Sequence, residues 1–416
     1  MNNMEIRFLE ALRASLERKT LQWNTNISEQ QWLEFYHQAE IQNVLPLIFE
    51  TVYSCPAKQS ISPAQQKLYR RKTLQDVMLQ TMRTEAFLKI EAALREAGVT
   101  PLIIKGIICR SLYPMPDHRP SSDEDLLIPE EQFALCHRVL LEQGMSLLHP
   151  EQNTETAFEV SYGMKDNPLH IEVHKQLFSP DAEAYRECNA FFDGVWNRAV
   201  EMPVNGTMML TLGYTDQLLY LICHAFKHFL HSGFGLRQVC DITLFANRYG
   251  KDIDWYRVLV CCRSIHAEHF AATLFRIGRN YLTFSPRQAH YPKQWRDLER
   301  DELPMLDDLF DSGVFGGRTM SRKHSSTVTL NEVAAQKQGK PSHAPRLLRT
   351  IFPRAQELKG RYPYLERKPF LLPVAWAGRI TAYWKEAKHT PHNSATEAME
   401  IGDKRIALMK QYGILK

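Results

Sequence analysis

Apolar residues recur at helical spacing through roughly the first 95 residues of the chain. A glycine, Gly98, follows the last of these sets and marks the end of its helix. We therefore expect residues 1–98 to form a helical N-terminal region with a packing role. The sets that share the spacing are Phe8, Leu9, Leu12 and Leu16; Trp32, Phe35, Tyr36 and Ala39; and Leu79, Met82, Ala86, Ile90 and Leu94.

The pattern changes between residues 99 and 205. Short apolar runs bounded by glycine and proline replace the helical spacing, which predicts strands alternating with short helices in a small α/β unit. Two helices are expected, at 107–113 and between Pro129 and Gly144. The expected strands are 101–104, 126–128, 145–148, 157–162 and 169–173.

Helical spacing returns in the region 206–310, and the remainder, 311–416, is mixed. Residues 318–345 are rich in Ser, Thr, Lys and Gln, which predicts a loop or linker, and 388–394 are also linker-like. The apolar stretch with basic flanks at 369–384 is expected to pack on the protein's own core, as part of a helical or irregular C-terminal segment. The candidate helices in the region 206–310 are 215–231, 236–249, 254–265 and 267–282.

Composition narrows the choice of ligand and compartment. The net charge of +4 fits a polyanion such as a nucleotide, but it is too small to argue for DNA or RNA binding. The 8 cysteines form no C-x-x-C pair, which is typical of reduced thiols. Neither a signal peptide nor an apolar run of membrane-spanning length is present, so we expect a cytoplasmic protein without a membrane partner.

Two aspartates separated by one residue are the main candidates for chemistry. If Asp123 and Asp125 lie in or beside a strand, their side chains point the same way, and Glu124 points away from them. Two carboxylates at so short a distance repel one another unless a cation lies between them. Mg²⁺ prefers such oxygen ligands. The pair therefore indicates metal-assisted phosphoryl or nucleotidyl transfer. The alternative is a solvated acidic turn.

A Lys-Gly turn precedes the aspartates. Gly106 would let the backbone approach a ligand, and the helix that follows offers free N–H groups to an anion. Lys105 could pair with a phosphate as a point charge. Arg119 could steer a phosphate or neutralise the acids. The alternative is an ordinary connection between a strand and a helix.

A third acidic position lies in the segment from His170 to His174. On a strand, His170, Glu172 and His174 share one face, so Glu172 would supply a third carboxylate to the metal site and could accept a proton. Two alternatives remain open: a transition-metal site built on the histidines, because imidazole suits such ions, and a structural role.

A second histidine cluster follows at His224, His228 and His231, with Arg237 and Asp241 beyond it. The three histidines share one face of a helix. We expect a role at an interface or in substrate recognition, with a structural role and a metal site as alternatives. The chain carries no P-loop, nucleophile elbow, kinase signature or H-E-x-x-H motif.

Taken together, these segments resemble the bacterial uncharacterised nucleotidyltransferase family, within the DNA polymerase β-like nucleotidyltransferase superfamily. The resemblance extends from about Trp32 to about Trp384. The segments that carry it are Lys105-Gly106, Tyr113-Pro114, Arg119-Pro120, Asp123-Glu124-Asp125-Leu126-Leu127, Glu172-Val173-His174, His224 to Asp241, Gly313-Val314-Phe315-Gly316, and Arg361-Tyr362-Pro363-Tyr364 to Pro373.

The resemblance implies an α+β fold. Residues 99–205 would form a minimal nucleotidyltransferase core, a mixed β-sheet with flanking helices, accompanied by N- and C-terminal helical regions. It also implies that Asp123, Asp125 and Glu172 bind two Mg²⁺ ions. Gly106 would lie beside the triphosphate of an NTP such as ATP.

The function expected on these grounds is transfer of a nucleoside monophosphate from an NTP to an acceptor hydroxyl by a two-metal, in-line mechanism. Lys105 and Arg119 would neutralise phosphate charge, and His174 would orient Glu172 or the acceptor. The acceptor could be a small molecule, an RNA end or a protein. A second hypothesis is an inactive module that binds a nucleotide or a partner, motivated by Ile107 and Glu124, where the superfamily has other residue types. A third is a histidine-metal phosphohydrolase.

Overall fold

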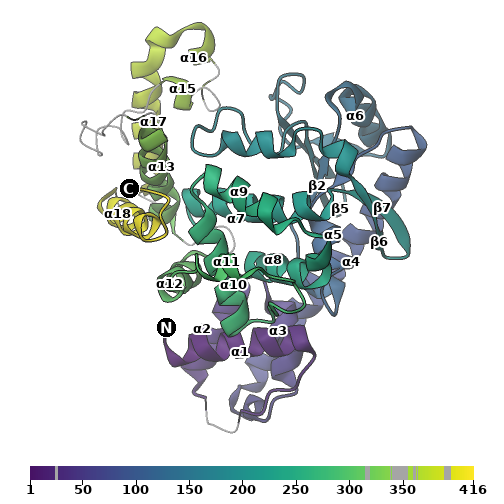
Figure 1. The fold of residues 1–416 in the computed structure, drawn as a ribbon, viewed down its shortest axis with the longest axis vertical. Helices are drawn as coiled ribbons and strands as arrows, with labels where there is room; N and C mark the ends of the chain where they lie inside the picture. The colour runs from purple at the N-terminus through teal and green to yellow at the C-terminus, as the bar shows by residue number, and fades with distance from the viewer. Residues whose placement is uncertain are drawn as a thin grey trace.

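The computed structural model describes residues 1–23, 27–313, 319–337, 339, 355–358, 362, 364–387 and 395–416. Its fold is α+β, as expected: one mixed sheet, with helical regions at both ends of the chain (Figure 1). The resemblance segments at 314–316, 361 and 363 and the linker expected at 388–394 lie outside the described residues.

The sheet has seven strands in the order β3-β4-β5-β2-β1-β7-β6. Only the β2–β5 and β1–β7 pairs are parallel, and the first of these lies near the middle of the sheet. The strands are β1 (Leu102–Ile103), β2 (Glu124–Leu127), β3 (Met145–Leu147), β4 (Glu159–Met164), β5 (Asn167–His174), β6 (Val200–Val204) and β7 (Thr207–Thr211).

The first five strands confirm the sequence-based predictions, as do the helices between them, α5 (Gly106–Arg110) and α6 (Phe133–Glu142). The β6–β7 hairpin was not predicted. Its turn is Asn205-Gly206, with positive φ of 49° and 77°, which only a few residue types adopt readily. Because β7 pairs with β1, the sheet continues past residue 205.

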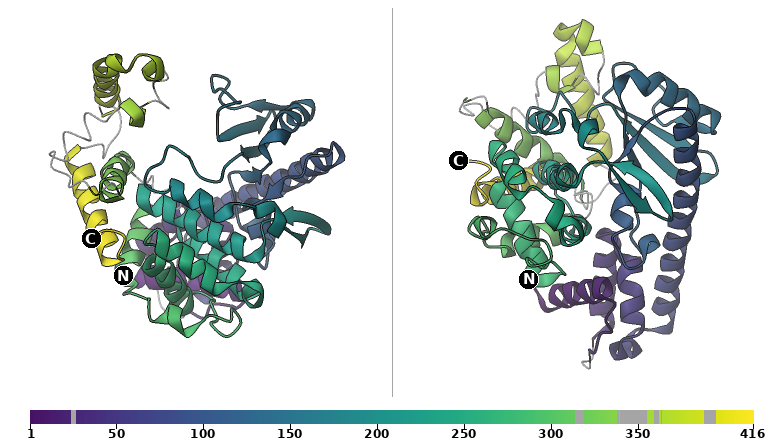
Figure 2. Two further views of the ribbon diagram at one scale, coloured as in Figure 1. Left: turned by 45° about the horizontal axis from the view of Figure 1, so that its top comes forward. Right: turned by 45° about the vertical axis from the view of Figure 1, so that its right-hand side comes forward.

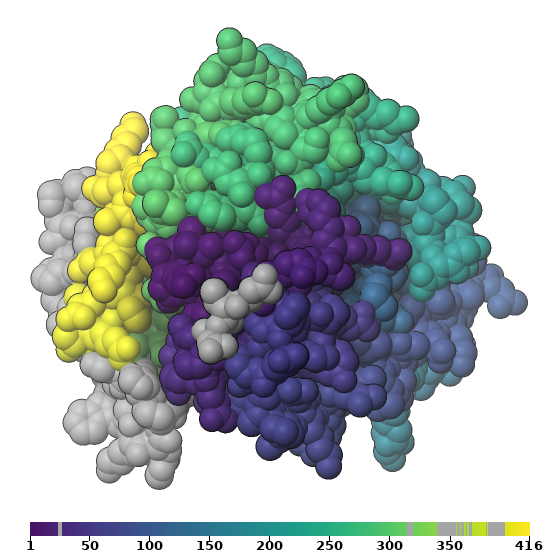
Figure 3. All heavy atoms as spheres, turned by 90° about the horizontal axis from the view of Figure 1, so that it is seen from below, coloured from purple at the N-terminus to yellow at the C-terminus, as the bar shows by residue number. Residues whose placement is uncertain are grey.

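The N-terminal region is helical, as predicted. Its longest helix, α4, runs along the sheet (Figure 2, right) and donates from Arg83 to the Pro168 carbonyl of β5 at 2.9 Å. Seen from below, α1–α3 lie between α4 and the green helices of the middle region (Figure 3). The helices are α1 (Asn3–Glu17), α2 (Glu29–Ile41), α3 (Leu45–Tyr53) and α4 (Pro63–Glu96).

The middle region supplies the helices that face the sheet across the candidate site. All four predicted helices are present, and the side chain of Gln217 on α7 donates to the Ile104 carbonyl at the end of β1, which fixes α7 to the sheet. The helices are α7 (Tyr214–His231), α8 (Leu236–Tyr249), α9 (Trp255–Ser264), α10 (Glu268–Tyr281), α11 (Lys293–Arg296) and α12 (Leu303–Ser312).

The loop predicted at 318–345 is wrong over 320–337, where the chain forms helix α13 (Met320–Lys337). Polar composition led to the wrong prediction, because small hydroxyl residues make up part of the buried face of this helix. Ser321, Ser325 and Thr329 are buried four residues apart, and Thr329 donates to the Leu230 carbonyl of α7 at 2.6 Å. Residues 338 and 340–345 lie outside the described residues.

The C-terminal helices lie on the side of the middle region away from the sheet (Figure 1). They are α15 (Ala355–Leu358), α16 (Tyr364–Arg367), α17 (Leu372–Ala387) and α18 (Ala395–Gln411). All 8 cysteines are unpaired, and all but Cys261 are buried. Among the described helices, none has both the length and the apolar character needed to span a bilayer.

Candidate metal centre

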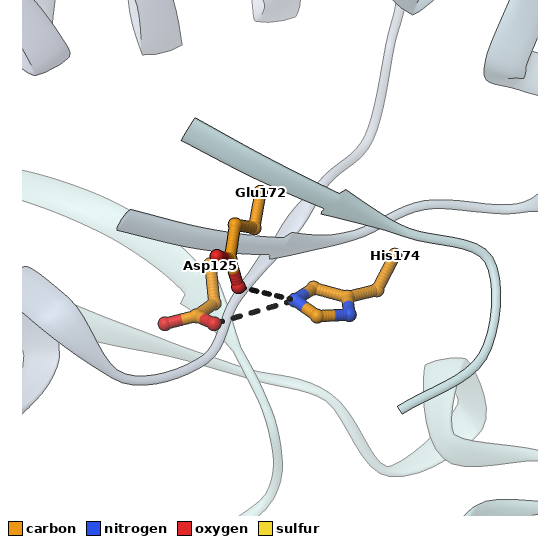
Figure 4. Close-up of side chains that lie close together, drawn as sticks. All are labelled: Asp125, Glu172 and His174. Carbon is orange, nitrogen blue, oxygen red and sulfur yellow. Dashed lines mark hydrogen bonds and ion pairs between the residues drawn. The ribbon is translucent and has the colours of Figure 1, made fainter. Parts of the chain in front are cut away.

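Register between β2 and β5 brings two of the predicted acids together. In this parallel pair, Asp125 lies directly opposite Glu172, and Leu127 lies opposite His174. Side chains at paired positions share one face of the sheet, so Asp125, Glu172 and His174 converge (Figure 4). The strand placement of Asp125, rather than an acidic turn, makes this convergence possible, whereas Asp123 lies just before β2.

Asp125 is the most enclosed of the acids, with 2% of its surface exposed. Its Oδ2 lies 3.0 Å from Lys105 Nζ, and its Oδ1 lies 3.3 Å from His174 Nε2. Burial opposes ionisation, but Lys105 and His174 outweigh it and lower the pKa of Asp125. Asp125 is therefore held as a carboxylate between Lys105 and His174.

Glu172 sits in a less favourable electrostatic environment. Burial raises its pKa to about 7, and the neighbouring carboxylates of Asp125, Asp123 and Glu159 act in the same direction. One ligand atom each from Asp125, Glu172 and His174 lie within 4.8 Å of one another. Crowded acids at this spacing, with an imidazole beside them, form a donor set that a divalent cation would satisfy.

His174 connects the acids of three strands. Its Nε2 lies 3.8 Å from Glu172 Oε2, and its Nδ1 lies 3.5 Å from Glu159 Oε2 on β4. Burial lowers the pKa of His174, but the hydrogen bond and charge of Asp125, with Glu159 and Glu172, raise it overall. Glu159 was not predicted as part of the site, although the β4–β5 register places it opposite His174.

Lys105 faces the acids. Besides its contact with Asp125, its Nζ lies 3.9 Å from Asp123 Oδ1. Burial disfavours the ammonium, but Asp123 and Asp125 raise its pKa well above the usual value. A lysine predicted to pair with phosphate is therefore held by the two aspartates instead.

Glu124, between the two aspartates, points to the opposite side of β2, as predicted. There it forms a buried ion pair with Arg110 at 2.6 Å and accepts the N–H of Ile107 at 2.8 Å. The start of α5, which was expected to offer its N–H groups to an anion, thus receives an internal carboxylate. Gly106 leaves the space in which this carboxylate lies.

Arg119 is bound to Asp241 rather than to the acids of the sheet. Two hydrogen bonds, of 2.9 and 2.6 Å, join the guanidinium to both carboxylate oxygens, and Tyr113 donates to Asp241 at 2.8 Å. The third nitrogen, NH1, is buried and has no hydrogen-bond partner among the residues that the structure describes. Asp241, whose role the sequence left open, therefore positions Arg119.

The site opens into a cavity of about 280 Å³ between the sheet and helices α7 and α8. The sheet side carries the acids, whereas the helical side is basic and imidazole-rich. Arg237 is 8% exposed, and its Nε has no hydrogen-bond partner among the described residues. The helical side chains that line the cavity are Tyr220, Leu221, His224, Lys227, His228, Arg237, Gln238 and Asp241.

The three histidines of the second cluster do not all face the cavity. His224 and His228 line the cavity, with their Nε2 atoms 3.3 Å apart, and Gln238 Nε2 lies 3.4 Å from His224 Nδ1. His231 instead contacts the hydroxyl of Tyr185 at 3.1 Å, and His170, on β5, is exposed. Lys227 was missed, although its position three residues after His224 on the same helix was a usable signal.

Fold and site together define an α+β protein with a candidate metal centre in a cavity that has one acidic and one basic side. The model of the uncharacterised nucleotidyltransferase family matches residues 28–283, and the chain belongs to that family. Neither the comparison with curated proteins nor that with solved structures found a match.

Proposed function

We propose that the protein is a divalent-metal-dependent nucleotidyltransferase that moves a nucleoside monophosphate from an NTP to an acceptor hydroxyl. One observation supports this most strongly: Asp125 and Glu172 are register partners on parallel strands, and they face a cavity whose opposite side carries Lys227 and Arg237. One side of the cavity therefore carries carboxylates that can hold a cation, and the opposite side carries cationic side chains that can bind phosphate. This arrangement suits an NTP bound together with a metal ion. Membership of the DNA polymerase β-like superfamily is part of the proposal.

The donor set fits a divalent cation such as Mg²⁺. Asp125, Glu172 and His174 would hold it, because their ligand atoms already lie within 4.8 Å of one another. When bound, the ion supplies Lewis acidity to the α-phosphate and the acceptor hydroxyl. Asp123, 24% exposed at its side chain, adds negative charge at the edge of the same site.

Different residues of the chain then take different roles in an in-line displacement. Glu172 accepts the proton of the acceptor hydroxyl as the bond from its oxygen to the α-phosphorus forms. The bond from the α-phosphorus to the bridging oxygen breaks, and pyrophosphate leaves. Lys227, Arg237 and the free NH1 of Arg119 neutralise the negative charge that develops on pyrophosphate.

The acceptor has room in an adjoining cavity of about 440 Å³, which shares Ser121 and Ser122 with the first. Its lining includes the acidic side chains Glu40 and Asp76 from α2 and α4. We propose that the acceptor reaches the α-phosphate from this direction. The candidate acceptors are small molecules, RNA ends and proteins.

Incubation of a cell lysate with the protein and α-labelled NTPs tests the proposal, with pyrophosphate measured in parallel. We expect an acceptor to gain label and an equal amount of pyrophosphate to be released. Asp123→Asn, Asp125→Asn and Glu172→Gln should each lower both signals at least a hundredfold, whereas Glu201→Gln, an exposed position on β6, should keep them. Full activity in the Glu172→Gln variant would contradict the proposal.

A second candidate, a nucleotide-binding module without turnover, is favoured by one contact. The Ile107 N–H, which would otherwise point toward a phosphate at the start of α5, is engaged by Glu124. This candidate predicts calorimetric binding of ATP with a divalent cation but no pyrophosphate with any acceptor in the lysate.

A further inference from the structure

The ammonium group of Lys105 lies where a cation between the two aspartates would be expected. We propose that Lys105 takes the place of one of the two divalent ions implied by the family resemblance. The centre then binds a single ion, with His174 as a nitrogen ligand. This inference rests on the proposed function only for the location of the site.

The two oxygens of Asp125 face different side chains. Oδ2 contacts Lys105 Nζ at 3.0 Å, and Oδ1 faces His174 Nε2 at 3.3 Å. An ion bridging Asp123 and Asp125 would need Oδ2, and it would lie against the ammonium nitrogen. Like charges at contact distance in a poorly hydrated site repel strongly, so the ion and the ammonium exclude one another.

Lys105 is also held in place. Its side chain is 14% exposed, unlike a surface lysine that swings freely into water. The residue after it, Gly106, packs against Glu124, and the next N–H, from Ile107, donates to the same carboxylate. Glu124 in turn is paired with Arg110. The backbone that carries the lysine is therefore anchored from the opposite side of β2.

The remaining ligands form a mixed oxygen and nitrogen set. Asp125 Oδ1, Glu172 and His174 Nε2 would bind the ion, and Glu159 lies 3.5 Å from the other ring nitrogen of His174. A carboxylate on the second ring nitrogen is the usual way to orient a metal-bound histidine. Imidazole suits transition ions such as Fe²⁺ and Zn²⁺, and the carboxylates suit Mn²⁺, so we expect the mixed set to bind Mn²⁺ and to accept later transition ions as well.

The ion count is tested by titrating the purified protein with Mn²⁺ and following the electron paramagnetic resonance signal of free ion. The titration is run with and without an α,β-methylene ATP analogue. We expect one ion per chain in both conditions for the wild type and two for Lys105→Met. Lys227→Met, which removes the same charge across the cavity, should keep one. Two ions on the wild type, or no second ion in Lys105→Met, would overturn the proposal.

The nitrogen ligand is tested by pulsed paramagnetic resonance on the bound Mn²⁺. A ¹⁴N coupling should be present in the wild type and in His228→Asn and lost in His174→Asn; its absence from the wild type would also overturn the inference. Circular dichroism establishes that each variant folds. If Lys105→Met does not fold, Lys105→Arg replaces it: retention of charge predicts one ion, and two would count against the proposal. Neither measurement needs turnover, so a failure of nucleotide transfer is distinguishable from a wrong ion count.

Discussion

The carboxylate of Glu124 fills the space that a side chain on residue 106 would need. A Cβ placed on Gly106 would lie 1.9 Å from Glu124 Oε2, and φ at this glycine is +29°. The same oxygen also accepts the backbone N–H of Ile107, so one carboxylate fills the space beside Gly106 and binds the residue after it. The turn that carries Lys105 is fixed by an internal carboxylate.

Gly106→Ala should therefore destabilise the protein by about 1–3 kcal/mol through overpacking, beyond the conformational cost of losing a glycine. The measurement is the free energy of unfolding in urea. Gly144→Ala is a matched control, because Gly144 also has positive φ, +81°, but no atom within 4 Å of the added Cβ. Its loss should be only about 1 kcal/mol. Equal losses in the two variants would show that Glu124 does not set the requirement.

Asp241→Ala should lower stability by about 3–5 kcal/mol, because it leaves the buried guanidinium of Arg119 without its counter-ion. Both residues are at most 2% exposed. The double variant Arg119→Met/Asp241→Leu removes both charges and should recover much of that loss. Thermal unfolding of the wild type and the two variants measures this. A double variant less stable than Asp241→Ala would contradict the interpretation of the pair.

Lys227→Met should weaken NTP binding about tenfold while leaving the stability of the protein nearly unchanged. The lysine lines the cavity opposite the acids, and one charge-assisted contact to phosphate contributes about 1.5–3 kcal/mol. Calorimetric titration with the α,β-methylene analogue gives the dissociation constant. Lys89→Met, at an exposed position on α4, is the control. Unchanged affinity in Lys227→Met would place the phosphates elsewhere.

The buried histidines His228 and His231 should make the folded protein less stable as the pH is lowered from 7 toward 4. Burial, followed by the charges of Lys227 and other cations, lowers the pKa of His228 to about 3 and that of His231 to about 4. On unfolding, the pKa of each of these histidines rises to about 6.5. Between these values the unfolded chain binds more protons, so each histidine contributes a loss of up to ~1.4 kcal/mol per pH unit.

Urea unfolding at a series of pH values checks this prediction. His228→Asn should flatten the decline below pH 6.5, whereas His149→Asn, at a side chain that is 63% exposed, should not. A pH dependence of His228→Asn identical to that of the wild type between pH 6.5 and 4.5 would show that His228 is not held neutral.

Much of the fold was predictable because local sequence patterns identify its helices and strands. Helical spacing of apolar residues located α7 to α10, and short apolar runs located β1 to β5. The β6–β7 hairpin had a local signal too, Asn205-Gly206. Helix α13 had no such signal, since small hydroxyl residues bury a helix face only when another helix lies close enough to accept their hydrogen bonds.

By itself, the sequence determined which carboxylates share a strand face, because side-chain direction alternates along a strand whatever surrounds it. That is why Asp125 and Glu172 could each be assigned to a strand face, whereas their pairing depends on the register of β2 and β5. Only the tertiary structure decided where the positive charges lie: Lys105 on the aspartates, and Arg119 on Asp241, 122 residues away in the chain. Ion pairs between distant segments depend on how those segments pack, and local periodicity contains no information about that packing.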